Sequence, residues 1–366
     1  MGFNCGIVGL PNVGKSTLFN ALTKKRIPAE NYPFCTIDPN IGVVIVPDER
    51  INLITSLVKP EKTIYPYVEF YDIAGLVKGA HEGQGLGNQF LSHIRNTSAI
   101  VHVIRDFKNS EIIHVENRVN PKEDKEIIEA ELILKDLETV EKSLIKVRED
   151  ARRDKKNEKY LNMVLDIKTT MESGKLANTY QITEKDIELE KFRKSLFLIT
   201  DKPFIYMVNT EIDNCNDGMK GKYREMLELD NEANIILMDV KVEAEIAELD
   251  GEERFEFMKE FGINESALDK LIRESYKILG LMSFFTAGPK EVRGWTIKKG
   301  YTAPQAAGEI HGDFMDKFIT AEVIAYNDFI SSEGSWIKAK EQGKMRLEGK
   351  DYIVKDGDLM VFRHGA

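Results

Sequence analysis

Residues 9–16 read GLPNVGKS, and this stretch decides the fold. It fits the pattern G-x-x-x-x-G-K-[ST] of the phosphate-binding P-loop. The apolar run at residues 5–8 predicts a buried strand before it, and residues 16–22 predict a helix after it. A glycine loop between a strand and a helix makes an anion site, because loop N–H groups and the positive end of the helix dipole converge on a phosphate. The sequence therefore predicts an α/β nucleotide-binding domain with a doubly wound, mostly parallel sheet.

The residue types within the loop predict their roles. Lys15 is expected beside the β- and γ-phosphates, and the Ser16 hydroxyl is expected to bind Mg²⁺. A chance match in an ordinary loop is the alternative, and the flanking strand and helix argue against it.

Composition limits the class of protein. A chain of 366 residues is too long for one ordinary core and predicts two or three domains. The net charge of −10 is unsuited to coating nucleic acid, so an RNA contact needs a local basic patch. Three widely spaced cysteines, no long apolar stretch and no visible signal peptide favour a reducing cytoplasm and predict no membrane contact.

Two later segments predict the switches of a G domain. Residues 31–40, NYPFCTIDPN, form a loop in which Thr36 is expected to reach Mg²⁺ when a γ-phosphate is present. The strand at residues 67–72 ends in Asp72, which is expected to hold Mg²⁺ through water, and the Gly75 N–H is expected to sense the γ-phosphate. Leu76 stands where many GTPases place the glutamine that orients the attacking water, and a leucine does not do this.

A strand is also predicted at residues 100–105, and His114 follows it near a proline-containing loop. Because histidine titrates near neutral pH, His114 is a candidate for positioning the attacking water. A purely structural histidine explains the position equally well.

Residues 128–199 predict an inserted helical hairpin. Apolar residues from Ala130 to Ala151 follow the 3-4 spacing of a coiled-coil seam, and the basic run at residues 152–156 interrupts it. The basic tip is either a contact surface or a solvated turn.

The strand at residues 203–209 ends in Asn209, which begins the base-reading segment of a G domain. The usual pattern is N-K-x-D, whose aspartate accepts hydrogen bonds from guanine. Here Ile212 stands at the aspartate position, so the donors of guanine lose their partner and ATP is expected over GTP. Glu211 and Asp213 remain alternatives as guanine readers.

Residues 281–366 predict a small α+β domain. Strands are expected at residues 283–286 and 292–297, with a helix capped by Thr302. Strands at residues 352–354 and 359–362 flank Asp356-Gly357, a hairpin-turn pattern. The lysine-rich stretch 338–350 either contacts RNA or is an ordinary solvent-exposed surface.

Several long stretches together resemble the YchF / Obg-like ATPases, a branch of the Obg group of P-loop proteins. They are residues 9–16, 31–37 (NYPFCTI), 72–80 (DIAGLVKGA), 284–288 (FFTAG), 302–308 (TAPQAAG) and 349–358 (GKDYIVKDGD). This resemblance implies a G domain at residues 1–127 and 200–280, the hairpin at 128–199, and a β-grasp TGS domain at 281–366. It also implies ATP preference, Mg²⁺, ribosome association and redox regulation.

The resemblance also assigns residues to the site. Residues expected at the nucleotide are Asn12, Val13, Gly14, Lys15, Ser16, Thr17, Asn209 and Thr210. Leu76 matches the hydrophobic residue that the family has in place of the catalytic glutamine, and Cys35 is the redox candidate. The family usually has N-x-x-E after the base-binding strand, whereas Glu211 comes one residue early here.

The expected function is a slow, Mg²⁺-dependent ATPase switch acting at the ribosome. Its partners are expected to be the large subunit and the 70S particle, with rRNA contacts through the hairpin tip or the TGS domain. The alternatives are a GTPase of the Obg group, a metabolic P-loop kinase, and a binding module that nucleotide rigidifies without a need for hydrolysis.

Overall fold

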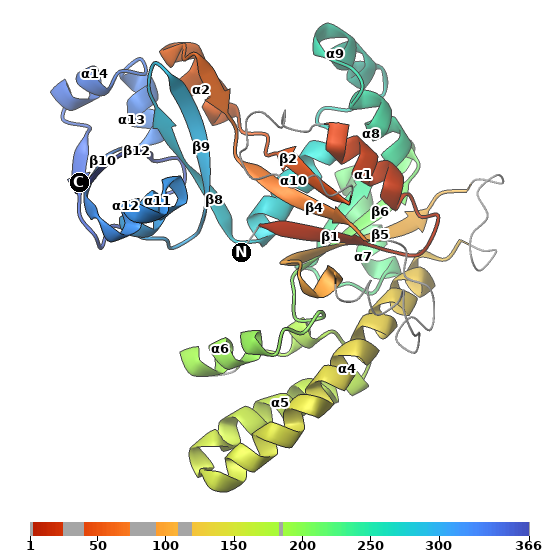
Figure 1. The fold of residues 1–366 in the computed structure, drawn as a ribbon. Coiled ribbons are helices and arrows are strands. Elements are labelled where there is room, and N and C mark those ends of the chain that lie inside the picture. Colours follow the sequence, from red (N-terminus) through yellow and green to blue (C-terminus); the bar gives the residue numbers. More distant parts are fainter. Residues whose placement is uncertain (1–2, 25–39, 74–92, 109–118, 183–185, 366) are drawn as a thin grey trace. The chain divides into compact units, whose positions relative to one another are not determined.

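A computed structural model describes residues 3–24, 40–73, 93–108, 119–182 and 186–365 (Figure 1). They fall into two compact units. The first contains the described residues within 1–24, 38–42 and 69–268, and the second contains the described residues within 43–68 and 269–366.

A six-stranded sheet forms the centre of the first unit, in the order β2-β4-β1-β5-β6-β7. β1 pairs in parallel with β4 and β5, and β6 pairs in parallel with β5 and β7. All residues of β1 and β6 are buried, because helices cover both faces of a parallel sheet. The strands span Ile41–Ile45 (β2), Tyr67–Asp72 (β4), Asn4–Val8 (β1), Ala99–Asp106 (β5), Phe204–Thr210 (β6) and Asn234–Met238 (β7).

Helices follow the strands, so the carboxyl ends of β1, β5, β6 and β7 share one edge of the sheet. The predicted P-loop helix is confirmed. The helices of this unit are α1 (Lys15–Lys24), α7 (Lys220–Met226), α8 (Val240–Ile246) and α9 (Gly251–Glu260), with short 3₁₀ turns η4 (Ile212–Asn214) and η5 (Asp217–Met219). Helix α10 (Ala267–Ile278) begins at the end of this unit, and most of its residues belong to the second unit.

An antiparallel helical hairpin is inserted between β5 and β6 (Figure 1). The predicted seam is buried at Ile133, Val140, Leu144 and Val147. Ala130, its first predicted position, is exposed, because the start of α4 packs against β5 instead. The elements are α4 (Pro121–Arg153), η2 (Lys155–Asn157), α5 (Glu158–Glu172), η3 (Ala177–Thr179) and α6 (Ile187–Ser195).

One buried carboxylate fixes the hairpin where the chain returns to the sheet. Asp136, on α4, accepts hydrogen bonds from the backbone N–H groups of Ile199 at 2.9 Å and Thr200 at 2.7 Å. These bonds tie the middle of α4 to the segment that leads into β6.

The second unit is built on a mixed sheet in the order β11-β10-β12-β8-β9-β3. Phe284 and Phe285 are neighbours on β8 and point to opposite faces, so each face carries its own apolar cluster. The strands are Arg346–Glu348 (β11), Phe318–Ile324 (β10), Leu359–His364 (β12), Leu281–Ala287 (β8), Glu291–Lys298 (β9) and Lys62–Ile64 (β3). The helices are α2 (Glu49–Val58), α11 (Ala303–Ile310), α12 (Gly312–Asp316), α13 (Tyr326–Ser331) and α14 (Trp336–Glu341).

α2 and β3 come from the stretch that sequence analysis placed in the nucleotide domain. Ile51 and Ile54 of α2 are fully buried in the cluster that contains Phe285. Arg50 also forms ion pairs with Asp48 and Asp356. The N-terminal segment thus completes the C-terminal unit.

A turn forms at Asp356-Gly357 as predicted, but the two segments that were expected to pair across it do not form a hairpin. The turn forms, with Gly357 at φ +89° and the Asp358 carboxylate accepting the N–H of Lys355 at 2.9 Å. Residues 352–354 are not a strand, and Ile353 makes an isolated bridge with Thr302. β12 pairs instead with β10 and β8.

Among the described residues, no helix is long and apolar enough to cross a bilayer.

Candidate nucleotide-binding site

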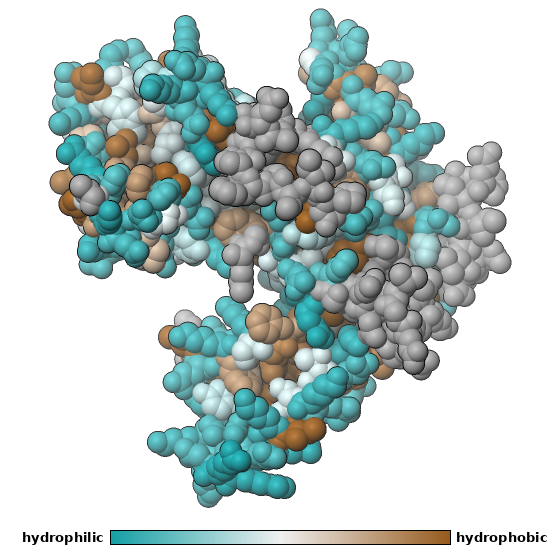
Figure 2. Space-filling view, in the orientation of Figure 1, coloured by the Kyte–Doolittle hydropathy of each residue, from teal (hydrophilic) through white to brown (hydrophobic). Residues whose placement is uncertain are grey.

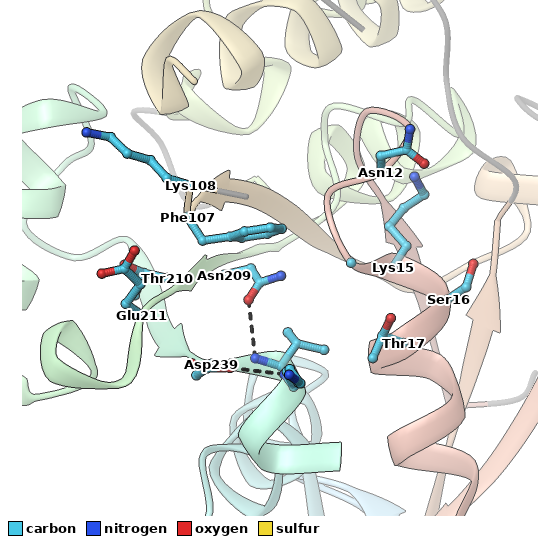
Figure 3. Close-up of a pocket in the computed structure, with 13 residues that line it drawn as sticks. Asn12, Lys15, Ser16, Thr17, Phe107, Lys108, Asn209, Thr210, Glu211 and Asp239 are labelled. Carbon is cyan, nitrogen blue, oxygen red and sulfur yellow. Dashed lines mark hydrogen bonds between the residues drawn. The ribbon is translucent and has the colours of Figure 1, made fainter. Parts of the chain in front are cut away.

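A cavity of about 570 Å³ lies at the carboxyl edge of the first sheet (Figure 3). This volume is in the range of small-molecule sites. It is lined by Asn12, Gly14, Lys15, Ser16, Thr17, Phe107, Lys108, Asn209, Thr210, Glu211, Asp239, Val240 and Lys241. The loops after β1, β5, β6 and β7 therefore meet where the topology predicts a ligand.

The lysine of the P-loop is buried and held by its own loop. Lys15 Nζ donates to the carbonyl of Leu10 at 2.6 Å. Burial lowers the pKa of Lys15 to about 8, and the carboxylate of Asp72 partly opposes this shift. A buried cation held by a neutral carbonyl can exchange that carbonyl for a phosphate.

Close approach of two segments explains the second P-loop glycine. Gly14 has φ +102°, and a Cβ on it would lie 2.5 Å from Nδ2 of Asn209. A larger residue would be strained and would also push Asn209 away from the loop.

Asn209 joins three parts of the site. Its Nδ2 donates to the carbonyl of Val13 at 3.0 Å. Its Oδ1 accepts from the N–H of Val240 at 3.2 Å, the bond that Figure 3 marks at Asn209. Asp239 caps α8 by accepting from the N–H groups of Lys241 and Val242. The carbonyl of Val13 thus binds Asn209 within the site, whereas the side chain of Val13 is buried.

Sequence analysis missed an aromatic wall of the cavity. Phe107 follows β5 and extends over Asn209 in Figure 3. The guanidinium of the buried Arg105 packs over the Phe107 ring, 4.3 Å from its centre. The available clue was position, since Phe107 directly follows a strand predicted to end at this edge.

The Thr210 hydroxyl is engaged by a buried network. It lies 2.9 Å from the hydroxyl of Tyr223, which donates to Asp106 at 2.5 Å. Asn214 also donates to it, at 3.2 Å. This network fixes the ends of β5 and β6, which carry the base side of the cavity.

Glu211 lines the cavity, whereas Ile212 begins the short turn η4. Figure 3 shows Glu211 beyond Asn209, on the side away from Lys15 and Ser16. Among the described residues lining the cavity, the other carboxylate is Asp239, which caps α8.

Ser16 and Asp72 fit a magnesium site by their chemistry. Ser16 lies in the first turn of α1 and lines the cavity, and Asp72 ends β4 close enough to Lys15 to influence its pKa. The described residues hold no group of three or more His, Cys, Asp or Glu side chains able to bind a metal. A phosphate-linked Mg²⁺ needs no such cage, because phosphates and water supply most of its ligands.

Five predicted residues lie outside the described part of the chain: Cys35, Thr36, Gly75, Leu76 and His114. Of the cysteines that are described, Cys5 is buried, and burial raises the pKa of Cys215 to about 12.

Comparisons with known proteins agree with this geometry. The family model described as "50S ribosome-binding GTPase" matches residues 4–210, and the YchF-GTPase C-terminal model, described as a protein of unknown function, matches residues 281–365. The "Ribosome-binding ATPase YchF" of Bacillus subtilis is 50% identical over 99% of both chains. The protein of the same name from Escherichia coli O157:H7 is also 50% identical, over 99% of both chains.

A solved structure extends the likeness to the whole fold. The structure of the Schizosaccharomyces pombe YchF GTPase superposes with a TM-score of 0.87 at 37% identity, covering 98% of this chain and 97% of that one. The predicted P-loop G-domain fold is confirmed. With near-complete coverage by relatives at half identity, the chain belongs to the YchF family.

Proposed function

We propose that this chain is a Mg²⁺-dependent ATPase switch that associates with the ribosome and works in the cytoplasm. The observation that carries the proposal is the convergence of the P-loop, Phe107 and Asn209 on one cavity. The loop supplies phosphate-binding groups, and the aromatic ring and β6 supply a base-binding wall.

In this proposal the P-loop residues Asn12 to Thr17 wrap the phosphates, and Lys15 leaves the Leu10 carbonyl to bind them. Ser16, Thr36 and a water on Asp72 hold Mg²⁺, which neutralises charge on the phosphates. Gly75 senses the γ-phosphate, and His114 positions water. With Leu76 at the glutamine position, intrinsic hydrolysis is slow.

ATP is proposed over GTP because the side chain of Ile212 offers no acceptor to the N–H groups of guanine. Phe107 stacks on either base, so the choice depends on polar contacts at the base edge. Glu211 lines the cavity and keeps GTP as a second candidate. The names of the relatives reflect both, since the bacterial proteins are called ATPases and the fission-yeast protein a GTPase.

Ribosome association is proposed from the names of the bacterial relatives. Within the large subunit or the 70S particle, we propose that the hairpin tip contacts rRNA. Arg152, Arg153, Lys155 and Lys156 are all exposed there. In the C-terminal unit, which we propose to be the β-grasp TGS domain, Lys338 pairs with Glu333 and is less available for phosphate.

Lys15→Ala tests the proposal. The variant should lose ATP hydrolysis, because the phosphates lose their buried cation, while thermal unfolding stays close to that of the parent. If Lys15→Ala binds ribosomes and supports cell growth as the parent does, hydrolysis is not required and the binding-module alternative holds.

A further inference from the structure

Arg105 is a charged residue in the buried part of the first unit. Elsewhere charged side chains meet water, and Figure 2 shows hydrophilic residues gathered over the outer end of the hairpin. Arg105 is the last residue but one of β5, and it is 1% exposed. Taking a charge out of water costs free energy unless its partners compensate. The contacts of this guanidinium therefore indicate what it does.

The side chain of Arg105 contacts one residue of the cavity lining in two ways. Its Nε donates to the carbonyl of Phe107 at 3.3 Å. Its guanidinium lies 4.3 Å from the centre of the Phe107 ring. A cation within about 6 Å of a ring centre is attracted by the ring quadrupole. Arg105 thus holds both the backbone and the ring of Phe107.

A buried carboxylate stands near the guanidinium. Asp124 lies in the first turn of α4 and is 2% exposed. Burial lowers the pKa of Arg105, and the negative charge of Asp124 opposes this shift. Because the ordinary pKa of arginine is above about 12, the side chain stays protonated near pH 7. The cation is therefore present beside the ring at neutral pH.

The arginine reaches the nucleotide site through the ring. Among the described residues that line the cavity, Phe107 is included and Arg105 is not. Figure 3 shows the Phe107 ring extending over Asn209, on the side where a base is proposed to lie. The residue between the two is fixed as well, because Asp106 accepts a hydrogen bond from Tyr223 at 2.5 Å.

We propose that Arg105 is a positioning residue of the base site, which fixes the ring of Phe107 in the plane that stacks on a purine. Stacking depends on the relative orientation of the two rings, and a ring already held in place loses less freedom on binding. The inference rests on the nucleotide binding proposed above. It predicts an effect on any purine nucleotide and none on a ligand without a base.

The first test compares ligands with and without a base. Arg105→Leu should weaken binding of ATP and of GTP about fivefold or more. It should leave the affinity for inorganic tripolyphosphate with Mg²⁺ unchanged, because the P-loop is intact. Competition with a ribose-labelled fluorescent ATP analogue gives each dissociation constant, and thermal unfolding reports the fold.

A matched control removes another partly buried arginine that contacts an aromatic ring. The guanidinium of Arg193 lies 5.7 Å from the centre of the Tyr180 ring and pairs with Asp201, and none of these three residues lines the described cavity. Arg193→Leu should lower the thermal unfolding midpoint and leave all three affinities unchanged. Arg105→Lys is the second variant if the leucine does not fold. It keeps the charge but loses the Nε–H, so it should show the same selective loss to a smaller extent.

The second test asks whether the arginine acts through the ring. Phe107→Leu alone should weaken ATP binding about tenfold or more, because it removes the stacking surface. Adding Arg105→Leu to Phe107→Leu should cause no further loss, since the two side chains form one unit. Losses that multiply in the double variant would show that the arginine acts by another route.

The outcomes separate this inference from the proposed function. If the parent chain binds neither ATP nor GTP, the nucleotide site fails and the inference fails with it. If the parent binds ATP, the inference alone is overturned by any of three results: an Arg105→Leu variant with parental ATP affinity, an equal loss of tripolyphosphate affinity, or independent losses in the double variant. Parental ATP affinity in Phe107→Leu would overturn both the inference and the proposed aromatic wall.

Discussion

The side-chain amide of Asn209 donates to the carbonyl of Val13 at 3.0 Å, which ties the base-binding strand to the phosphate-binding loop. Its oxygen accepts from Val240, so one side chain joins the loops after β1, β6 and β7. Asn209→Ala leaves two buried backbone groups unpaired, at a cost of about 1–3 kcal/mol each. Nucleotide affinity, measured by calorimetry, should fall at least about tenfold. Asn216→Ala, which removes an exposed hydrogen bond, should leave affinity unchanged.

Gly14→Ala tests the close approach to Asn209. The new Cβ would lie 2.5 Å from Nδ2 at a backbone φ of +102°, so the loop and the asparagine must separate. Nucleotide binding should be lost or strongly reduced. Gly174→Ala is the control, because Gly174 has φ +81° with open space around it and carries the backbone strain of roughly 1–2 kcal/mol without the clash. Equal nucleotide affinity of the two variants would contradict this role for Gly14.

Nucleotide affinity should depend on pH above about 8. The free protein has a Lys15 pKa of about 8, and bound phosphates raise it. The protonated lysine favours binding, so its contribution is complete below pH 8 and is lost as the pH rises from 8 towards the pKa of the complex. Lys15→Arg stays charged throughout and should remove this dependence if it binds at all. Titrations with non-hydrolysable ATP from pH 7 to 9.5 measure the slope, and a flat parent profile would refute the assignment.

How far the sequence predicts this site depends on how local each feature is. The P-loop is contiguous, so glycine, lysine and serine spacing identify it without tertiary information. Phe107 has no such pattern, because an aromatic residue after a strand has many uses. The partner of a strand is also non-local: Asp356-Gly357 specifies a turn, yet β12 pairs with β10 and β8. The packing of α2 into the C-terminal unit is non-local for the same reason.

That packing predicts a stability effect. Ile54 is fully buried in the C-terminal unit, so Ile54→Ala should cost about 2–5 kcal/mol. Leu53→Ala, on the exposed side of α2, should cost within about 0.5 kcal/mol. A fragment of residues 281–366 should be much less stable than one that also carries residues 43–68. Equal unfolding midpoints of the two fragments would show that α2 is dispensable.

Thiol chemistry should be confined to Cys35. Cys5 is fully buried and out of reach of an oxidant in solvent, and burial raises the pKa of Cys215 to about 12, so Cys215 stays a thiol near pH 7. Mild peroxide should change the ATPase rate of the parent and of Cys215→Ser, but not of Cys35→Ser. Peptide mass spectrometry should find oxidation at Cys35 alone. An unaltered peroxide response in Cys35→Ser would remove it as the sensor.

Phosphate release from ATP and from GTP, each with and without purified ribosomes, tests the central claim most directly. The account predicts slow release from ATP, faster release when ribosomes are added, and much weaker activity with GTP. A preference for GTP would contradict the ATP preference that we infer from Ile212. It would indicate that Glu211 accepts the hydrogen bonds from guanine. No release from either nucleotide, with or without ribosomes, would contradict the ATPase assignment itself.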